Sequence, residues 1–394
     1  MSPEILIVGG GPVGSAVALQ LHRAGRRVLL LDAGASSSKI CGEGLLPPGW
    51  AALEELGVAG QVVDKAAIEE VVYAVPEPRT GRLRTLRAPV SRPSFGVRRE
   101  TLCRAFEQVL KEEAVPVLRP ARFRTLAWEG EGLQVEVEAG GERRRIACQT
   151  LVGADGLHSP VRREAGLVAP EPRRFARWGT RVYFPNPGCR AVTVTLGEGV
   201  ESYMTPLGKG LCGLAFLWSP HELGRPLPGE GATWERLLAR FPPSVREVLP
   251  SPEEFFGADR AIGPLQQRVL SPLHASGKIA LVGDAAGYLD ALTGEGLCLG
   301  LLQARALSRL LLEGRLEDYP AAHRAIKERH QVVVHLLLWL LARPALKERV
   351  FAALLHTPDL FVRLVRTAVE DQPWQRLVGG DAIRFLYYLL RGES

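Results

Sequence analysis

Ile5-Leu-Ile-Val-Gly-Gly-Gly-Pro-Val-Gly14 is the stretch of the sequence that decides the fold. Its four leading apolar residues predict a strand that is buried on both faces. The glycines then follow as Gly9-x-Gly11-x-x-Gly14, which is the spacing of the dinucleotide-binding fingerprint. In that fingerprint the first glycine permits a tight turn, the second lets a pyrophosphate approach the backbone, and the third lets a helix pack on the strand.

The residues that follow supply the other elements that the fingerprint requires. An amphipathic run over 15–24 predicts a helix, and a second apolar strand over 28–31 ends at Asp32. The N-terminus of such a helix carries unpaired N–H groups and the positive end of the dipole, which favour phosphate. A carboxylate at the position of Asp32 can accept hydrogen bonds from the ribose of a bound dinucleotide. The sequence therefore predicts a parallel α/β domain that binds a dinucleotide.

The composition is that of an ordinary globular protein. The chain has 394 residues, of which 46% are hydrophobic and 23% charged, so it is long enough for two or more lobes. The net charge is +6, but basic residues are scattered among acidic ones, which favours a solvated surface over nucleic-acid binding. The mild excess of positive charge also suits an anionic ligand such as a pyrophosphate.

The cysteines and the apolar runs bear on metal binding and location. The six cysteines are dispersed without a Cys-x-x-Cys pair, so we expect neither a metal site nor a disulfide framework. Reduced thiols are typical of a cytoplasmic protein. We expect no signal peptide because the first strand begins at Ile5, and the longest apolar run, 332–342, is too short to span a bilayer.

A second informative stretch follows a predicted strand over 146–152. Asp155 and Gly156 come at the end of this strand, and Ser159-Pro160 has the residue types that begin a helix. These residues alone are explained equally well by a ligand site and by a capped strand-to-helix turn.

A third stretch has the same order of elements. A buried strand over 279–282 ends in Gly283-Asp284, a loop passes through Gly294-Glu295-Gly296, and a helix is predicted over 297–312. The N-terminus of this helix can point its N–H groups at an electron-rich group.

Another glycine-rich segment reads Lys39-Ile-Cys-Gly-Glu-Gly-Leu45. The glycines beside Cys41 indicate backbone that lies close to a flat ligand. A small buried hydrophobic role for Cys41 is the alternative interpretation.

The remaining segments predict a sheet and a helical end. Residues 68–97 and 170–260 show the alternation of strands, and we expect their sheet to hold the substrate. Aromatic residues in this sheet are candidates for the substrate pocket, although most aromatics at strand spacing belong to the core: Trp178, Tyr183, Tyr203, Phe216 and Trp218. Residues 319–394 are predicted to be helical, and the run 336–341, which is apolar on every face, is expected to be buried.

Together, the three motifs resemble those of flavin-dependent monooxygenases of the aromatic hydroxylase type. They also resemble the geranylgeranyl reductases and the electron-transfer-flavoprotein–quinone oxidoreductase type. The resemblance covers residues 1 to about 315 and implies that the cofactor is FAD. It further implies that the cofactor contacts residues from every motif, namely Gly9, Gly11, Gly14, Asp32, Cys41, Gly42, Arg99, Asp155, Gly156, Gly283, Asp284, Gly294, Glu295, Gly296 and Leu297.

The resemblance also implies how these residues are divided along the cofactor. The glycine triplet and Arg99 would meet the pyrophosphate, and Asp32 the adenosine ribose. Asp155 would brace the phosphate region, and Asp284 would bind the ribityl chain. The helix N-terminus at 294–297 would lie near the flavin pyrimidine.

Two segments resemble the geranylgeranyl reductases more closely than the hydroxylases. The run 39–45 is similar to their Lys-x-Cys-Gly-Gly-Gly-Leu, and 293–297 is similar to their Thr-Gly-Glu-Gly-Ile. Gly287 stands where aromatic hydroxylases usually have His. The expected reaction is therefore reduction of a C=C bond by reduced flavin, with Cys41 near the flavin as a candidate proton donor.

Two alternatives to this reaction remain open. One is a monooxygenase that uses O2 with NAD(P)H as a transient electron donor. The other is a non-catalytic FAD-binding protein or an electron carrier at the membrane surface. In each case the expected partner is an apolar small molecule, and peripheral membrane contact through the C-terminal helices is the alternative to a purely cytoplasmic protein.

The predicted fold is mixed α/β (α+β overall), with three parts. A Rossmann-like FAD-binding domain comprises 1–67, 96–168 and 260–318. An inserted antiparallel-sheet substrate domain comprises 68–95 and 169–259. A helical region, 319–394, completes the chain.

Overall fold

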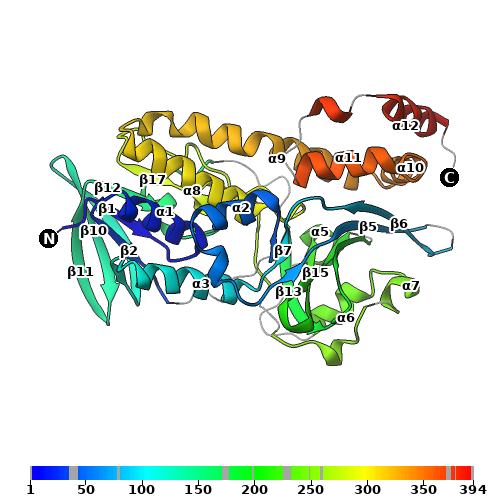
Figure 1. Ribbon diagram of the computed structural model, residues 1–394, viewed down its shortest axis with the longest axis horizontal. Helices are drawn as coiled ribbons and strands as arrows, with labels where there is room; N and C mark the ends of the chain where they lie inside the picture. Colours follow the sequence, from blue (N-terminus) through cyan, green and yellow to red (C-terminus); the bar gives the residue numbers. More distant parts are fainter. Residues whose placement is uncertain are drawn as a thin grey trace.

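The computed structural model has a mixed α/β fold with several sheets and a group of C-terminal helices (Figure 1). It describes residues 2–34, 43–77, 80–170, 177–197, 199–224, 232–247, 249–257, 261–369, 374–377 and 379–391. The predicted fold class is confirmed.

A parallel sheet forms the first part of the molecule. In the described part of the chain it has five strands in the order β17 (Ile279–Leu281), β12 (Thr150–Gly153), β1 (Ile5–Val8), β2 (Val28–Leu31) and β8 (Val117–Leu118). All four neighbouring pairs are parallel. Since β12 lies between β1 and β17, the carboxyl ends of these three strands meet at one edge of the sheet. The three glycine-rich motifs follow these strand ends, so the topology brings them together.

Helices cover one face of this sheet, and a small antiparallel sheet covers the other (Figure 1). The helices are α1 (Pro12–Arg23), α2 (Pro47–Glu55), α3 (Arg99–Glu112) and α8 (Gly296–Leu312). The small sheet consists of β9 (Ala121–Glu129), β10 (Gly132–Ala139) and β11 (Glu142–Cys148). One buried apolar cluster lies on each face of the parallel sheet, which explains why its central strands are apolar throughout.

The strand predicted over 146–152 is two strands. β11 ends at Cys148 and pairs with β10, whereas β12 begins at Thr150 and pairs with β1 and β17. The change of sheet falls at the polar residues Gln149 and Thr150, where the apolar run is interrupted.

A six-stranded sheet forms the second part of the described chain (Figure 1). Its order is β13 (Trp178–Pro185), β16 (Leu211–Trp218), β15 (Val200–Leu207), β14 (Ala191–Leu196), β5 (Glu70–Pro76) and β6 (Leu83–Pro89). Neighbouring strands are antiparallel except for β5 and β14, which are parallel. The segments predicted over 68–97 and 170–260 thus join in one sheet through this parallel pair. A short sheet links the two parts, with β3 (Gly44–Leu45) and β4 (Ala66–Ala67) paired to β7 (Phe95–Gly96).

Shorter helices fill the connections. They are α4 (Pro160–Glu164), α5 (Pro220–Leu223), α6 (Ala232–Leu238) and α7 (Pro243–Arg246). A buried apolar cluster that includes Leu237 and Val245, from α6 and α7, also contains Phe216 and Trp218 of β16. This cluster fixes one face of the six-stranded sheet and leaves the other face toward the parallel-sheet part.

The C-terminal helices bridge the two parts. They are α9 (Tyr319–Leu341), α10 (Pro344–Leu355), α11 (Pro358–Val369) and α12 (Gly380–Arg391). α9 packs on α8, and α11 packs on β6 (Figure 1). The expectation that 336–341 is buried all round is wrong, since Leu336 is 61% exposed and Trp339 45% exposed while Leu338 is buried. None of the described helices combines the length and apolarity needed to cross a bilayer.

Candidate functional site

A cavity of about 390 Å3 lies where the carboxyl edge of the parallel sheet faces the six-stranded sheet. The three sequence motifs meet in its wall, which contains Gly11, Arg99, Asp155, Gly156, Gly283, Asp284, Gly294, Glu295, Gly296 and Leu297. Apolar residues of β5, β14 and β16 form the opposite wall, among them Val71, Val194 and Leu217. Val333 of α9 and Val365 of α11 contribute from the C-terminal helices.

The first and third glycines of the fingerprint shape the turn between β1 and α1. Gly9 has φ +113°, and a Cβ there would overlap the carbonyl oxygen of Ala154. A Cβ at Gly14 would overlap the carbonyl oxygen of Gly9. Neither glycine lines the cavity, so both act by shaping the turn and the approach of α1.

Gly11 lies at the cavity and opens the N-terminus of α1. Gly11 is the N-cap of that helix, and no side chain of the described residues caps it. A Cβ at Gly11 would lie 3.2 Å from Nη2 of Arg99, and the buried Nε of Arg99 has no hydrogen-bond partner in the described part of the chain. Open N–H groups beside a guanidinium make an anion-binding site.

Asp32 lies at the end of β2 as predicted, but it is 2% exposed and does not line the cavity. Its carboxylate accepts hydrogen bonds from the Gly34 N–H at 3.0 Å and from Nε of Arg119 at 2.5 Å. Arg119 follows β8, the neighbour of β2 in the sheet. Sequence reasoning missed Arg119 because nothing in the sequence shows that these two strands pair.

Asp155 and Ser159 bind the start of α4. Oδ2 of Asp155 accepts from the Val161 N–H at 3.0 Å, and Oγ of Ser159 accepts from the Arg162 N–H at 2.9 Å. The capping that the sequence predicts is therefore present, and Asp155 also reaches the cavity. Both interpretations of this stretch describe part of its structure.

Arg162 joins the second motif to the third. Its guanidinium, which is 2% exposed, donates to the carbonyl oxygens of Leu157, Asp284 and Ala285 at 2.7, 3.2 and 2.9 Å. A buried arginine that satisfies carbonyls on both motifs holds them in a fixed relation. The pattern Ser-Pro-x-Arg does not indicate this role, because the acceptors on the third motif, Asp284 and Ala285, lie more than 100 residues away.

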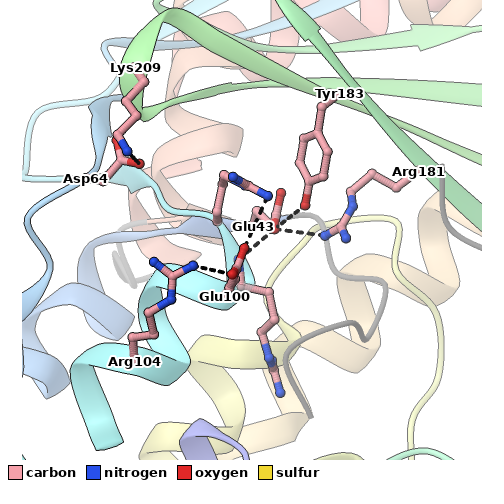
Figure 2. A network of polar contacts seen from close by, with 9 residues as sticks. Glu43, Asp64, Glu100, Arg104, Arg181, Tyr183 and Lys209 are labelled. Atoms are coloured by element: carbon pink, nitrogen blue, oxygen red, sulfur yellow. Dashed lines mark hydrogen bonds and ion pairs between the residues drawn. The ribbon is translucent and has the colours of Figure 1, made fainter. Parts of the chain in front are cut away.

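Glu43 is the centre of a buried polar network (Figure 2). Its Oε1 accepts from the backbone N–H of Arg99 at 2.6 Å and from the Tyr183 hydroxyl at 2.8 Å, and it pairs with Arg181 at 2.8 Å. The first contact places a carboxylate at the N-terminus of α3, where the helix dipole favours it. The other two contacts are with residues of β13. Glu43 therefore links the six-stranded sheet to Arg99, whose guanidinium lies beside Gly11. Burial raises the pKa of Glu43, and the neighbouring Arg181 opposes that rise.

Cys41 and Gly42, which precede Glu43, lie outside the described residues. Their predicted position near the cofactor stays a prediction.

The aromatic candidates divide between the two faces of the six-stranded sheet. Tyr203 lines the cavity, and its hydroxyl donates to Glu201 at 3.2 Å. Phe216 is also part of the wall, but its ring packs on Trp234 and Phe241 on the far face. Its neighbours Ala215 and Leu217 are part of the cavity wall, as the alternation of a strand requires.

Trp178, Tyr183 and Trp218 do not line this cavity. The indole of Trp218 is buried and donates to the Gly224 carbonyl oxygen at 3.2 Å, and Tyr183 binds Glu43. Trp178 packs on the apolar cluster of the far face. Tyr73, which the sequence did not single out, is part of the wall beside Val194.

A second buried charge cluster lies on the same side of the sheet. Arg177 forms an ion pair with Glu201 and another with Asp290 at 3.5 Å. Asp290 belongs to the loop between Asp284 and Gly294. Burial raises its pKa to about 6, although Arg177 lowers it. Arg177, directly before β13, and Arg181, in the middle of it, thus pair with two acids from outside the six-stranded sheet, Asp290 and Glu43.

Comparisons with known proteins agree with this geometry. A family model described as an FAD binding domain matches residues 2–318. The chain is 26% identical to a menaquinone reductase of Mycolicibacterium smegmatis, over 83% of this chain and 80% of that protein. It is 28% identical to the 6-hydroxy-3-succinoylpyridine 3-monooxygenase HspB of Pseudomonas putida, over 81% and 82% of the two chains. It is 26% identical to the 6-methylpretetramide 4-monooxygenase of Streptomyces rimosus, over 94% and 93%.

A solved structure shows the same fold over the whole chain. A flavoprotein/dehydrogenase from Cytophaga hutchinsonii superposes with a TM-score of 0.80 at 16% identity, covering 100% of both chains.

The residues of the site fit FAD. The open first turn of α1 and the partnerless Nε of Arg99 suit a pyrophosphate. A second uncapped helix N-terminus, that of α8, lines the same cavity, where Glu295 is the N-cap and no described side chain caps it. One elongated cofactor can therefore use both helix N-termini.

Proposed function

The chain belongs to the FAD binding domain family and is an FAD-dependent oxidoreductase, and on that basis we propose that it is a monooxygenase of a largely apolar small molecule. The observation that carries the proposal is the cavity, in which the cofactor motifs face an apolar wall from the six-stranded sheet. Among the relatives, HspB and the enzyme of Streptomyces rimosus are monooxygenases by name. These relatives favour oxygen insertion over the C=C reduction expected from 39–45.

Each motif has a part of the cofactor in this proposal. Gly11, Arg99 and the first turn of α1 hold the pyrophosphate, while Gly9 and Gly14 shape the turn beneath it. Asp32, fixed by Arg119, receives the adenosine ribose. Asp155 and Gly156 brace the phosphate region, with Gly283 and Asp284 at the ribityl chain. The N-terminus of α8, with Gly294, Glu295, Gly296 and Leu297, would lie near the flavin pyrimidine and would stabilise negative charge there.

The reaction consumes O2 and a reduced nicotinamide cofactor. When bound, FAD would pass two electrons from NAD(P)H to O2, so that one oxygen atom enters the product and the other leaves as water. The balance is substrate C–H + O2 + NAD(P)H + H+ giving product C–OH + H2O + NAD(P)+. The part of the chain is to position the substrate and to keep bulk water away from the reacting atoms.

The cavity wall indicates the class of substrate. Most side chains on the sheet side are aliphatic, and the hydroxyls of Tyr73 and Tyr203 are among its few polar groups. Such a wall suits an apolar molecule with one hydrogen-bonding group. The segments 68–95 and 169–259 supply this wall and act as the substrate domain.

The test follows the fate of oxygen in the holoenzyme. The protein is incubated with NADPH, 18O2 and a panel of alkylphenols and naphthols, with menadione as the probe for reduction. A product that carries one 18O atom, with one NADPH consumed per product, is the expected result. Two results together would overturn the proposal in favour of a reductase. They are stoichiometric reduction of menadione or of a C=C bond under anaerobic conditions, and no 18O in any product of the incubation with 18O2.

A further inference from the structure

Helix α9 begins at Tyr319, directly after residues 2–318, which the FAD binding domain model matches. The buried face of this helix is unusually polar. The buried residues on this face recur every three or four positions, and they are Tyr319, His323, Lys327, His330, Val334 and Leu338. Burying a lysine and two histidines on one helix is costly unless their polar groups have partners or a task.

The partners lie on one loop of the cofactor site. The Tyr319 hydroxyl donates to the Leu281 carbonyl oxygen at 2.9 Å, and the Lys327 Nζ donates to that of Gly287 at 3.1 Å. Nδ1 of His330 lies 2.8 Å from Oε2 of Glu295 and 3.1 Å from the Thr293 hydroxyl. These contacts run from the end of β17 to the start of α8. They therefore bracket the loop that carries both halves of the third motif.

The ammonium group of Lys327 fills a space that the loop leaves open. Gly287 has φ +97°, and a Cβ there would lie 3.7 Å from Nζ of Lys327. Burial lowers the pKa of Lys327 to about 8, and the carboxylate of Asp284 opposes that fall. Lys327 is thus a buried cation within electrostatic reach of Asp284.

The neighbour of Lys327 on this face differs from it. The pKa of His323 falls to about 3, because burial and the charge of Lys327 both disfavour its protonation. His323 is therefore neutral at pH 7, and Lys327 carries the positive charge of this part of the helix.

We propose that Lys327 and His330 are positioning residues of the FAD site. They hold the loop 283–297 so that Asp284 at one end and the N-terminus of α8 at the other meet the same cofactor molecule. Lys327 fixes the turn at Gly287 and the charge beside Asp284, and His330 fixes Glu295 and Thr293 at the cavity wall. The FAD site is then incomplete without helix α9, although α9 lies outside the matched region.

The first test measures FAD binding by apoprotein, followed by flavin fluorescence in the absence of any substrate. Lys327→Met keeps the length of the side chain and removes the charge, so the Kd for FAD should rise about tenfold, the equivalent of one buried polar contact. The melting temperature of the apoprotein should stay the same or rise, because a buried charge has been replaced by an apolar group. Arg324→Met is the matched control, since Arg324 is an exposed cation on the same helix, and it should leave the Kd within about twofold.

The second test uses His330 and does not depend on the folding of the lysine variant. His330→Ala should also raise the Kd about tenfold, whereas His330→Asn, whose amide can donate near the position of Nδ1, should restore most of the affinity. A purely structural role predicts the opposite pattern, in which apoprotein melting falls and the Kd stays unchanged. That pattern, or equal Kd values for the alanine and asparagine variants, would overturn the proposal. Neither experiment depends on the reaction being an oxygenation.

Discussion

The two buried carboxylates of Glu43 and Asp290 differ in their hydrogen-bond donors. Oε1 of Glu43 has three donors, including the ion pair with Arg181 at 2.8 Å. Asp290 accepts from the Leu292 N–H at 3.0 Å, and its contact with Arg177 is longer, at 3.5 Å. Arg177 also pairs with Glu201, so one cation serves two acids. Burial raises the pKa of both groups, and that of Asp290 rises to about 6.

Asp290 makes stability depend on pH in a defined direction. Its pKa is about 6 in the folded protein and 3.8 when exposed, so the folded state holds the proton more tightly. This contribution to stability is fully present below pH 3.8 and is lost as the pH rises through 6. The difference corresponds to ~3 kcal/mol at most. We predict that Asp290→Asn, which cannot titrate, gains stability relative to the wild type by up to that amount between pH 4 and pH 7.

Urea unfolding of both proteins at the two pH values measures this change. Glu69→Gln is the control, because Glu69 is 65% exposed and its pair with Arg190 is long, at 3.9 Å. A stability difference between wild type and Asp290→Asn that is the same at both pH values would show that folding does not raise the pKa of Asp290.

At the scale of elements, the turn between β1 and α1 depends on the absence of side chains. A Cβ at Gly14 would overlap the carbonyl oxygen of Gly9, and backbone atoms cannot move aside without opening the turn. We predict that Gly14→Ala lowers FAD affinity at least about a hundredfold and destabilises the protein by ~2–4 kcal/mol, as overpacking does. Flavin content after purification and urea unfolding measure the two effects.

Gly60→Ala is the matched control for this prediction. Nothing lies within 4 Å of a Cβ at Gly60, and its φ is not in the left-handed region. The control should retain flavin and wild-type stability. Equal flavin content in both variants would contradict the role given to the glycine turn.

The elements that the sequence predicted best are those with a strong local pattern. β1, α1 and β2 follow from an apolar run, a glycine triplet and an amphipathic helix, and all three lie where expected. The convergence of the three motifs at one cavity could be expected only through the family resemblance, because residues 155 and 284 are far apart along the chain. Strand pairing is the physical link, and pairing is not a local property.

The elements that were missed depend on contacts between distant segments. Arg119 binds the carboxylate of Asp32, and Arg162 binds backbone carbonyl oxygens of the third motif. Neither arginine belongs to a recognisable sequence motif. The aromatic ring of Phe216 makes it a candidate for the pocket, but the register of β16 turns that ring to the far face. The basic face of α9 was not recognised because a Lys and two His among apolar residues have the pattern of an ordinary amphipathic helix.

At the scale of the whole molecule, the C-terminal helices contribute both to the cavity wall and to an exposed apolar surface. α9 and α11 line the cavity on one side, whereas α12 exposes an apolar stripe. The members of the stripe follow the i, i+3, i+4, i+7 pattern of one helix face, and they are Ile383, Leu386, Tyr387 and Leu390. Arg384 and Arg391 lie on the same helix, and the guanidinium of Arg391 lies over the ring of Tyr387. Membrane contact through these helices stays a prediction, and this stripe is where we expect it.

Co-sedimentation with vesicles tests this prediction. The holoenzyme should pellet with vesicles of phosphatidylcholine and phosphatidylglycerol, and the double substitution Leu386→Glu and Leu390→Glu should abolish pelleting. Val63→Glu is the control, because Val63 is 86% exposed and lies far from α12 in the sequence. Failure of the wild-type protein to pellet, or equal pelleting of the double variant, would contradict membrane binding through this stripe.

The central claim is that the three motifs hold a single FAD whose ring end faces the apolar wall of the six-stranded sheet. A crystal structure of the protein with FAD tests this claim most directly. The account predicts the pyrophosphate between Gly11 and Arg99, and the flavin ring between the N-terminus of α8 and strands β14 to β16. A flavin ring outside this cavity, or a pyrophosphate away from the first turn of α1, would contradict it.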